Sequence, residues 1–465
     1  MVPNKTVTAE RMTLTADRGG LTIAGPGRIG KVPFDVSFHQ GFSPEQKGKS
    51  SVSGTAELSP ATVDEFALAL PQGLVAGKGT ARIDIAMAQG QPAQLKLTSD
   101  LRGVSMAIPQ VGWSKAAGES GRLTVDATLG RPITVDSLQL AAAGLEAKGQ
   151  VGIAAAGGLE RARFGQVKIG RWFEGPVDLV GRGKGVAPDV VVAGGRLDLR
   201  YLPDLARAGS GAAAQAGGKL SVELDRLQVN DGLSLRSVVA NLTLKGGMRG
   251  NFQGLVNGQA AVTGSIAPAR HGQAVQLHSN QAGDLLRAAE IFKTARGGKL
   301  DLILIPRAQK GVYDGQATLS DFRVRNASVL AELLSAISVV GLLEQLAGDG
   351  ILFQSGEAKF ILQPQAVEIV EASAIGASLG VTLSGLYATK TKQLALRGMI
   401  SPVYLLNGIG AALTRRGEGL FGFDYEISGR SDAPRVSVNP LSILTPGMFR
   451  DLFRRPPPVL RQAPK

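Results

Sequence analysis

Two glycine-rich runs of this sequence have residue types that bind phosphate groups in other proteins. The segment 25–30 (GPGRIG) matches the glycine pattern of dinucleotide-binding loops, and 48–50 (GKS) has the ending of a phosphate-binding loop. Neither run has the required context. Residues 31–34 continue as a strand instead of opening a helix, and Ser43 stands where the second motif needs glycine. We therefore predict no nucleotide site and no cofactor.

Metal and acid–base chemistry also lack candidates. The chain has no cysteine and three histidines, and His271 and His278 lie near each other in sequence without a third ligand nearby. No pair of carboxylates has a spacing that singles it out for general acid–base work. H-E-x-x-H does not occur, and the one G-x-S-x-G match, 376–380 (GASLG), continues as a predicted strand over 379–387 instead of opening a helix. We predict that the protein is not an enzyme and has no catalytic residues and no metal site.

The composition indicates a large folded protein with an anionic partner. Of the 465 residues, 62 are glycine, 44% are hydrophobic and 5% are aromatic, so a large core is available. The net charge of +13 suits nucleic acid, an acidic lipid surface or lipopolysaccharide. Single-strand binders interleave aromatic and basic residues, and no strand shows that pattern. We predict no nucleic-acid partner.

The elements that must position any site are mostly strands. Alternation of apolar and polar residues recurs along the chain, for example over 123–129 and 220–224. Roughly twenty such segments, most bounded by Gly, Asn or Asp, favour antiparallel strands that each have one apolar and one polar face. The fold class expected is mostly β, an elongated and strongly curved antiparallel sheet or groove with a few flanking amphipathic helices near the C-terminus.

Helical signals are fewer. Capping residues, glycine stops and apolar stripes predict helices over 59–70, 281–296, 326–346, 401–417 and 445–455. A Ser-Pro or Thr-Pro pair begins three of them. No apolar run is long enough to span a bilayer as a helix.

The last predicted helix is amphipathic and basic. One reading is that it docks on an anionic membrane surface or a partner, and the other is that it plugs the end of the sheet. The docking residues would be Met448, Phe449, Leu452 and Phe453 on the apolar face, with Arg450, Arg454 and Arg455 as the basic residues. A proline-rich basic tail, 456–465, follows.

The apolar faces of so many strands must be covered. The few helices are too short to cover a sheet that extends roughly 100 Å at about 4.8 Å per strand. The sheet must fold over on itself. The interior is then either a dry sandwich of small residues or an apolar groove that holds acyl chains, and composition prefers neither.

A resemblance bears on this choice. The region 280–455 resembles the AsmA-like family, in particular its YhdP-type branch, while 1–280 resembles it only in its glycine-punctuated strands. The runs that carry the resemblance are 320–334 (SDFRVRNASVLAELL), 341–343 (GLL), 348–353 (GDGILF), 372–376 (ASAIG), 400–407 (ISPVYLLN) and 438–447 (VNPLSILTPG).

The resemblance implies a Gram-negative envelope protein. Such proteins are usually held in the inner membrane by an N-terminal helix, lie in the periplasm, and form apolar β-grooves thought to carry phospholipid between the inner and outer membranes. Residues 1–10 have no apolar run, so we expect this chain to lack the anchor, either as a truncated product or because the anchor and an upstream section have been left off. The expected division is a groove of glycine-punctuated repeats over 1–280, an AsmA-like C-terminal region over 281–455, and the tail 456–465.

The leading hypothesis is therefore a non-enzymatic groove that transports phospholipid, with acyl chains, an anionic membrane surface and envelope proteins as partners. The residues expected to line the groove are Leu123, Val125, Leu129, Leu220, Val222, Leu224, Leu300, Leu302 and Leu304. One alternative is a structural or regulatory scaffold in outer-membrane biogenesis, with the same fold and a filled interior. Another is a surface adhesin built on a β-solenoid, against which the irregular strand spacing counts.

Overall fold

The protein is mostly β, with 61% of its residues in strands and 11% in helices. The computed structural model describes residues 6–66, 68, 70, 73–155, 157–203, 217–402 and 422–444. Within these residues, 27 strands are assigned to one mixed sheet and three to a second sheet. The predicted fold class, a mostly antiparallel β protein with a few helices, is confirmed.

Contacts between Cα atoms divide the chain into two compact units. The first contains 1–230 and 239–247, and the second contains 231–238 and 248–465. The strand β19 (Ser234–Thr243) thus contributes its first residues to the second unit and its last residues to the first. The boundary at residue 280, which followed from the resemblance, stays a prediction.

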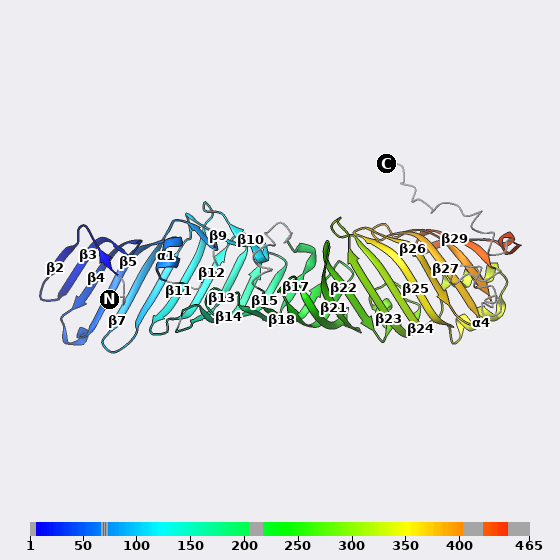
Figure 1. Ribbon diagram of the computed structural model, residues 1–465, viewed down its shortest axis with the longest axis horizontal. Coiled ribbons are helices and arrows are strands. Elements are labelled where there is room, and N and C mark those ends of the chain that lie inside the picture. The colour runs from blue at the N-terminus through cyan, green and yellow to red at the C-terminus, as the bar shows by residue number, and fades with distance from the viewer. Residues whose placement is uncertain are drawn as a thin grey trace. The chain divides into compact units, whose positions relative to one another are not determined.

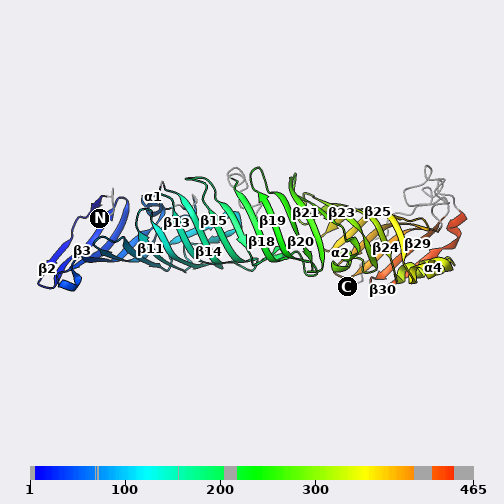
Figure 2. The ribbon, with the colours of Figure 1, turned by 90° about the horizontal axis from the view of Figure 1, so that it is seen from below.

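In the first unit, most strands pair antiparallel with the strand that follows them along the large sheet (Figures 1 and 2). Short glycine-containing turns connect many of them, which keeps the pairing local. The strands are β1 (Val7–Thr8), β2 (Thr13–Ala16), β3 (Gly20–Ile29), β4 (Val32–Gly41), β5 (Lys49–Leu58), β7 (Gly79–Ala88), β8 (Ala93–Ser99), β11 (Gly121–Leu129), β12 (Thr134–Ala142), β13 (Leu145–Ile153), β14 (Leu159–Ile169), β15 (Phe173–Val180), β16 (Asp189–Ala193), β17 (Arg196–Asp198) and β18 (Lys219–Gln228).

Two positions in this part of the sheet are occupied by a strand in two pieces. β1 and β2 both pair with β3, and β16 and β17 both pair with β15. The second interruption falls at Gly194 and Gly195, whose φ angles of 121° and 90° are readily adopted only by glycine. β18 then pairs parallel to both pieces, which is the departure from antiparallel pairing in this unit.

A second, three-stranded sheet lies in the first unit (Figure 1). Its strands are β6 (Val75–Gly77), β9 (Val104–Ile108) and β10 (Trp113–Lys115), with β9 in the middle. The helix α1 (Pro60–Glu65) contacts β6 and is shorter than the predicted 59–70. Short 3₁₀ helices occur at Pro44–Gln46, Pro109–Val111 and Leu199–Tyr201. The sequence pattern did not predict this second sheet.

The second unit continues the same architecture, with each strand antiparallel to the next. Its strands are β20 (Arg249–Val256), β21 (Ala260–Ala269), β22 (Gly272–Ser279), β23 (Ala295–Pro306), β24 (Tyr313–Val324), β25 (Ile351–Gln363), β26 (Ala366–Ile375), β27 (Leu379–Ala388), β28 (Gln393–Pro402), β29 (Phe423–Arg430) and β30 (Ala433–Asn439). The helices are α2 (Ala282–Ala288), α3 (Ser328–Ala336) and α4 (Val340–Ala347), and a 3₁₀ turn spans Pro440–Leu444.

Three further helix predictions differ from the structure. The helix expected over 281–296 ends with α2 at Ala288; Glu290, whose φ of 58° breaks the helical geometry, follows, and strand β23 begins at Ala295. The helix expected over 326–346 is two helices, separated at Ser338, whose φ of 58° breaks the helical geometry. Ser401 and Pro402 end strand β28 and do not begin a helix. The rest of 401–417 lies outside the described residues.

The core of the second unit lies where α3 and α4 pack on the sheet. Leu334 of α3 and Ile351 and Ile400 of the sheet are fully buried. The rings of Phe322 and Phe353, which are directly paired on β24 and β25, stack with centroids 5.3 Å apart. The two helices therefore close the apolar face at this end of the unit.

Candidate functional site

The first unit has a continuous apolar face that the strand register defines. Residues that are directly paired across neighbouring strands point to the same side of a sheet. Following these pairs across the strands gives a row of apolar residues without a polar interruption. The first row is Ile23, Phe38, Val52, Ile85, Leu95, Ala127, Val135, Val151, Ala162, Leu179, Val190 and Leu220.

A second row runs beside the first on the same strands. It consists of Gly25, Val36, Gly54, Ile83, Leu97, Val125, Leu138, Gly149, Phe164, Val177, Val192 and Val222. Each row crosses twelve strands, which corresponds to about 50 Å at roughly 4.8 Å between strands. We call the side of the sheet that carries these rows the apolar face.

The large side chains of the two rows are only partly buried. In the first row only Ala127 and Ala162 are buried, and in the second only Val192 is. The remaining isoleucine, leucine, valine and phenylalanine side chains keep an intermediate exposure. In an ordinary core such side chains are fully buried. The described residues of the first unit therefore leave much of this face uncovered.

The opposite side of the same strands is polar. Ser53, Asp84, Lys96, Asp126 and Ser137 are paired in series from β5 to β12. The charges alternate in sign along this row, which favours solvent exposure and discourages stacking against another sheet. The two faces differ so strongly that a one-residue shift of register would place every apolar side chain in water.

Phenylalanine rings on the apolar face lie over glycines of the neighbouring strand. Phe34 is paired with Gly27 and Phe164 with Gly149 in the first unit. A Cβ atom on either glycine would approach the ring to 2.7 Å. The same pairing joins Phe360 to Gly315 in the second unit. The rings can occupy these positions because glycine has no side chain.

The three-stranded sheet covers one rim of the apolar face. Trp113 of β10 is 6% exposed, and its indole Nε1–H donates to the carbonyl oxygen of Ala143, beyond the end of β12, at 3.1 Å. Leu101, next to β9, is buried and lies against Gly121 and Ala142 of the large sheet. This local cover leaves the central rows of the face open.

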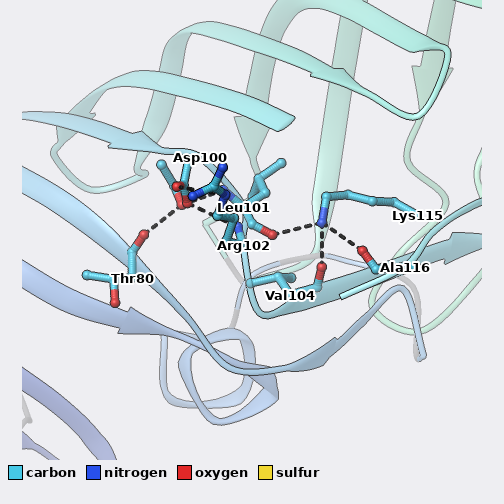
Figure 3. Close-up of polar contacts among 8 residues, drawn as sticks. Thr80, Asp100, Leu101, Arg102, Val104, Lys115 and Ala116 are labelled. Atoms are coloured by element: carbon cyan, nitrogen blue, oxygen red, sulfur yellow. Dashed lines mark hydrogen bonds and ion pairs between the residues drawn. The ribbon is translucent and has the colours of Figure 1, made fainter. Parts of the chain in front are cut away.

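Lys115 holds this cover together from the inside (Figure 3). Its side chain is 1% exposed, and its ammonium group donates to the carbonyl oxygens of Leu101 and Val104, each at 2.8 Å, and of Ala116 at 3.1 Å. Three donors thus meet three acceptors, which offsets the cost of removing the charge from water. The interaction joins β10 to the loop before β9.

The second unit also has an apolar face, in which glycines again lie opposite large apolar residues of the neighbouring strand. One row is Gly250, Ile266, Val275, Leu304, Gly315, Phe360, Ile369, Gly385, Leu396, Ile427 and Val436. Its members up to Ile369 are half-buried except the buried Gly315, while Leu396 and Ile427 are buried by the core near α3 and α4. The face is therefore filled at one end and more open at the other.

Tyr425 lies at the filled end of the apolar face of the second unit. Its ring belongs to the buried core, and its hydroxyl donates to the carbonyl oxygen of Thr382 at 2.7 Å. Burial raises the pKa of the Tyr425 hydroxyl far above its ordinary value, so it stays neutral. It sits beside Gly398, where a Cβ atom would lie 2.7 Å from the hydroxyl oxygen.

A shallow pocket of about 270 Å³ lies mainly on the other side of β23–β26. Ile303, Ile305 and Val370 line it and are 39%, 49% and 55% exposed. An ion pair between Arg307 and Asp314 at 2.6 Å lowers the pKa of that carboxyl group. The pocket is small and open, and its acid is already neutralised by arginine.

All nine predicted groove residues lie on the apolar faces. Val125, Leu220 and Val222 belong to the two rows of the first unit, and Leu304 belongs to the row of the second. Leu224 and Leu300 are buried, at 5% and 3% exposure, so they have little surface left for a ligand. The other members of the set, Leu123, Leu129 and Leu302, share the strand parity of their neighbours and are half-buried. Contact of these residues with lipid stays a prediction.

The predicted docking helix lies outside the described residues, with Met448, Phe449, Arg450, Leu452, Phe453, Arg454 and Arg455 and the tail 456–465. No helix in the described part of the chain is long and apolar enough to cross a membrane. Among the described residues there is no cluster of three or more histidine, aspartate or glutamate side chains suited to a metal ion. The prediction that the protein is not an enzyme stays a prediction.

Sequence reasoning missed several residues that shape the apolar face. Lys115 and Trp113 gave no period-two signal, because their strand has three residues. The pairing of phenylalanine with glycine depends on cross-strand register, which one strand's pattern does not contain. The alternation itself did identify the apolar positions within each strand.

No family model, no curated protein and no solved structure matches this chain.

Proposed function

We propose that the protein binds phospholipid through its apolar faces and transports it between the inner and outer membranes of a Gram-negative envelope, without catalysis. The acyl chains lie along the apolar rows, and the head groups remain at the wet rims of the sheet. The periplasm, in association with the inner membrane, is the proposed location.

The observation that carries the proposal is the uncovered apolar face of the first unit. Its two rows expose large apolar side chains over about 50 Å, whereas soluble monomers rarely expose continuous apolar patches beyond a few hundred Å². An acyl chain occupies half of a bilayer core of about 30 Å, so several fit side by side along the rows. A flexible apolar ligand removes this surface from water without a matching protein surface.

Three further observations support the same ligand class. Phenylalanine rings of the apolar faces lie over glycines of the neighbouring strands, which adds aromatic surface for acyl chains to contact. The net charge of +13 favours a ligand with an anionic head group. The resemblance of 280–455 to the AsmA-like family points to phospholipid and to the envelope.

The second candidate function is a scaffold in outer-membrane biogenesis that conducts no lipid. The filled core at α3 and α4 favours it, because side chains meet above the sheet there. That core occupies only one end of the second unit, so it does not account for the half-buried rows of the first unit.

The test compares two variants that differ by one position in β7. Ile85 lies in the first apolar row, and Ala86 is exposed on the polar face. We expect the protein purified without detergent to contain phospholipid by mass spectrometry of its extract, and Ile85→Asp to lose most of it. Ala86→Asp adds the same charge on the other face and should retain wild-type lipid.

Transfer of a fluorescent phospholipid between liposomes should follow the same order, with both variants checked for folding by circular dichroism. Absence of bound phospholipid together with absence of transfer by the wild-type protein would eliminate the transport function. Equal lipid loss in both folded variants would eliminate the apolar face as the binding surface.

A further inference from the structure

The short turns at one rim of the second unit carry an excess of positive charge. They connect β21 to β22, β23 to β24, β25 to β26, β27 to β28 and β29 to β30, and they span 270–271, 307–312, 364–365, 389–392 and 431–432. Their charged residues, all exposed, are Arg270, Arg307, Lys310, Lys390, Lys392 and Asp432. Five cations stand against one carboxylate in these turns, which we call the basic rim.

Ion pairs within the unit neutralise only part of this charge. The pairs are Arg307 with Asp314 at 2.6 Å and Arg430 with Asp432 at 2.8 Å. The turns contain no further carboxylate, so Arg270, Lys390 and Lys392 remain as excess positive charge. Every connection on this rim between β20 and β30 lies in the described part of the chain. The excess therefore belongs to the rim as a whole.

The opposite rim of the same unit is acidic and carries the helices. Its described connections include 280–294 with α2 and 325–350 with α3 and α4. Two ion pairs cancel within α2 and the loop that follows it, Arg287 with Asp284 and Lys293 with Glu290. The exposed charges that remain in these two connections are Arg325, Glu332, Glu344 and Asp349. An anionic group is therefore attracted to the basic rim and repelled from this one.

The apolar row next to the basic rim contains two tyrosines. Following the paired residues gives Pro306, Tyr313, Leu362, Val367, Tyr387 and Leu394, all half-buried. Tyrosine combines an apolar ring with a hydroxyl group, and it is enriched where the hydrocarbon of a bilayer meets the head groups. From the interior of the face to its edge, aliphatic residues thus give way to tyrosine and then to cations. A leaflet of a bilayer changes from hydrocarbon to charge in the same order.

The depth of the open surface at this rim matches one acyl chain. On β23, Pro306, Leu304 and Leu302 are half-buried, whereas Leu300 is 3% exposed. The distance from Pro306 to Leu302 is about 14 Å at roughly 3.4 Å per residue. The hydrocarbon of one leaflet is about 15 Å thick, half of a bilayer core. A chain that enters at the basic rim therefore ends where β23 becomes buried.

We propose that the second unit holds phospholipids in a single orientation, with their phosphate groups at the basic rim and their acyl chains directed over the apolar rows. Arg270 and Lys390 donate charge-assisted hydrogen bonds to phosphate oxygens. The rings of Tyr313 and Tyr387 contact the chains just below the head groups. The inference rests on the proposed function, and it specifies which of the two rims receives the head group.

The test maps where each end of a phospholipid contacts the full chain. One probe is phosphatidylglycerol with a photoreactive group on its head group, and the other has that group at the end of an acyl chain. The protein is loaded from liposomes and irradiated, and adducts are located by mass spectrometry of peptides. In the second unit we expect head-group adducts on 307–313 and 389–392 and few on 325–350. Acyl-chain adducts should lie on the inner parts of β23, β24 and β25.

Arg270→Glu combined with Lys390→Glu reverses two charges of the basic rim and leaves the apolar face unchanged. It should lower head-group adducts at this rim, relative to acyl-chain adducts, roughly threefold or more. Lys299→Glu combined with Arg325→Glu is the matched control, because both residues are exposed cations of the same unit away from this rim. The control changes the net charge equally and should keep the wild-type pattern. Circular dichroism checks that both variants are folded.

The two probes separate this inference from the proposed function. Acyl-chain adducts accompanied by head-group adducts of equal yield at both rims would overturn the single orientation and leave lipid binding intact. An equal loss of head-group adducts in the two double variants would overturn the role of the basic rim. Absence of acyl-chain adducts in the wild-type protein would overturn lipid binding and the orientation together.

Discussion

A few buried polar side chains hold neighbouring segments together through hydrogen bonds to backbone carbonyl oxygens. Lys115 supplies three donors to three backbone carbonyls. Tyr425 and Trp113 do the same on a smaller scale, each with one hydrogen bond to a carbonyl oxygen. Lys115 and Trp113 hold the three-stranded sheet of the first unit in place, and Tyr425 stabilises the core of the second unit.

Lys115→Met tests this role. Methionine keeps most of the apolar stem but leaves the carbonyls of Leu101, Val104 and Ala116 without their donor. We expect the free energy of unfolding of the first unit to fall by about 1–3 kcal/mol. Urea unfolding followed by tryptophan fluorescence measures it, because Trp113 and Trp172 both lie in this unit.

The matched control is Lys96→Met, which makes the same substitution at an exposed position of β8. Its effect should stay within about 0.5 kcal/mol. Equal effects of the two substitutions would show that the carbonyl contacts of Lys115 do not contribute to stability.

His278 gives the fold a pH dependence. Its Nδ1 lies 2.8 Å from an Asp301 carboxylate oxygen and its Nε2 lies 3.1 Å from the Asn280 side-chain oxygen. Both ring nitrogens face acceptors, so the hydrogen bond to Asp301, followed by that to Asn280, raises the pKa of His278 above its ordinary value. The stabilisation is then fully present below about pH 6.5 and is lost as pH rises through the raised pKa.

Asp301→Asn tests this effect. It removes the carboxylate and should return the pKa of His278 toward about 6.5. The titration is measured by NMR of the imidazole signals, which are few because the chain has three histidines. An unchanged titration of His278 in this variant contradicts the assignment.

At the scale of elements, the helices α3 and α4 act as the closure of the second unit. Leu334 is fully buried between α3 and the sheet, next to Leu346 of α4. Leu334→Ala leaves a cavity and should lower the stability of this unit by about 2–5 kcal/mol. Hydrogen exchange of α3, α4 and β25 followed by mass spectrometry should show faster exchange there.

Val340→Ala is the control for this substitution, because Val340 lies in α4 and is 64% exposed. It should leave exchange nearly unchanged. If both variants exchange at the wild-type rate, the packing of α3 on the sheet does not close the unit.

The strands were more predictable than the helices, for a physical reason. A strand with one wet and one apolar face shows its alternation in its own sequence, as in β11 and β18, and the predicted lining residues therefore lie on the correct faces. The helix expected over 281–296 ends at Ala288, and its last two predicted residues, Ala295 and Arg296, pair with β24 instead. Tertiary pairing outweighed local helix propensity there.

Neither the cross-strand register nor the small sheet that covers part of the apolar face could be predicted from the sequence. The three-stranded sheet consists of segments of three to five residues, which are too short to show a period. The alignment of Phe34 with Gly27 requires knowledge of which strands are neighbours. The sequence thus specified the faces of the sheet, and the pairing determined which surfaces remained open.

At the scale of the whole molecule, each unit repeats one design, a sheet with a continuous apolar face that its own helices and small sheet cover only in part. Exposing such an apolar surface to water costs free energy unless a ligand covers it. The proposed function therefore requires phospholipid to contact the apolar rows in native membranes.

A photo-crosslinking scan along β7 tests this claim most directly. The chain has no cysteine, so single cysteines introduced from Arg82 to Met87 can each carry a photoreactive label. Positions 83, 85 and 87 lie on the apolar face, and positions 82, 84 and 86 on the polar face. The account predicts phospholipid adducts, identified by mass spectrometry after irradiation with native membranes, that alternate along the strand and occur only at 83, 85 and 87. Adducts of equal yield on both faces, or none at any position, would contradict it.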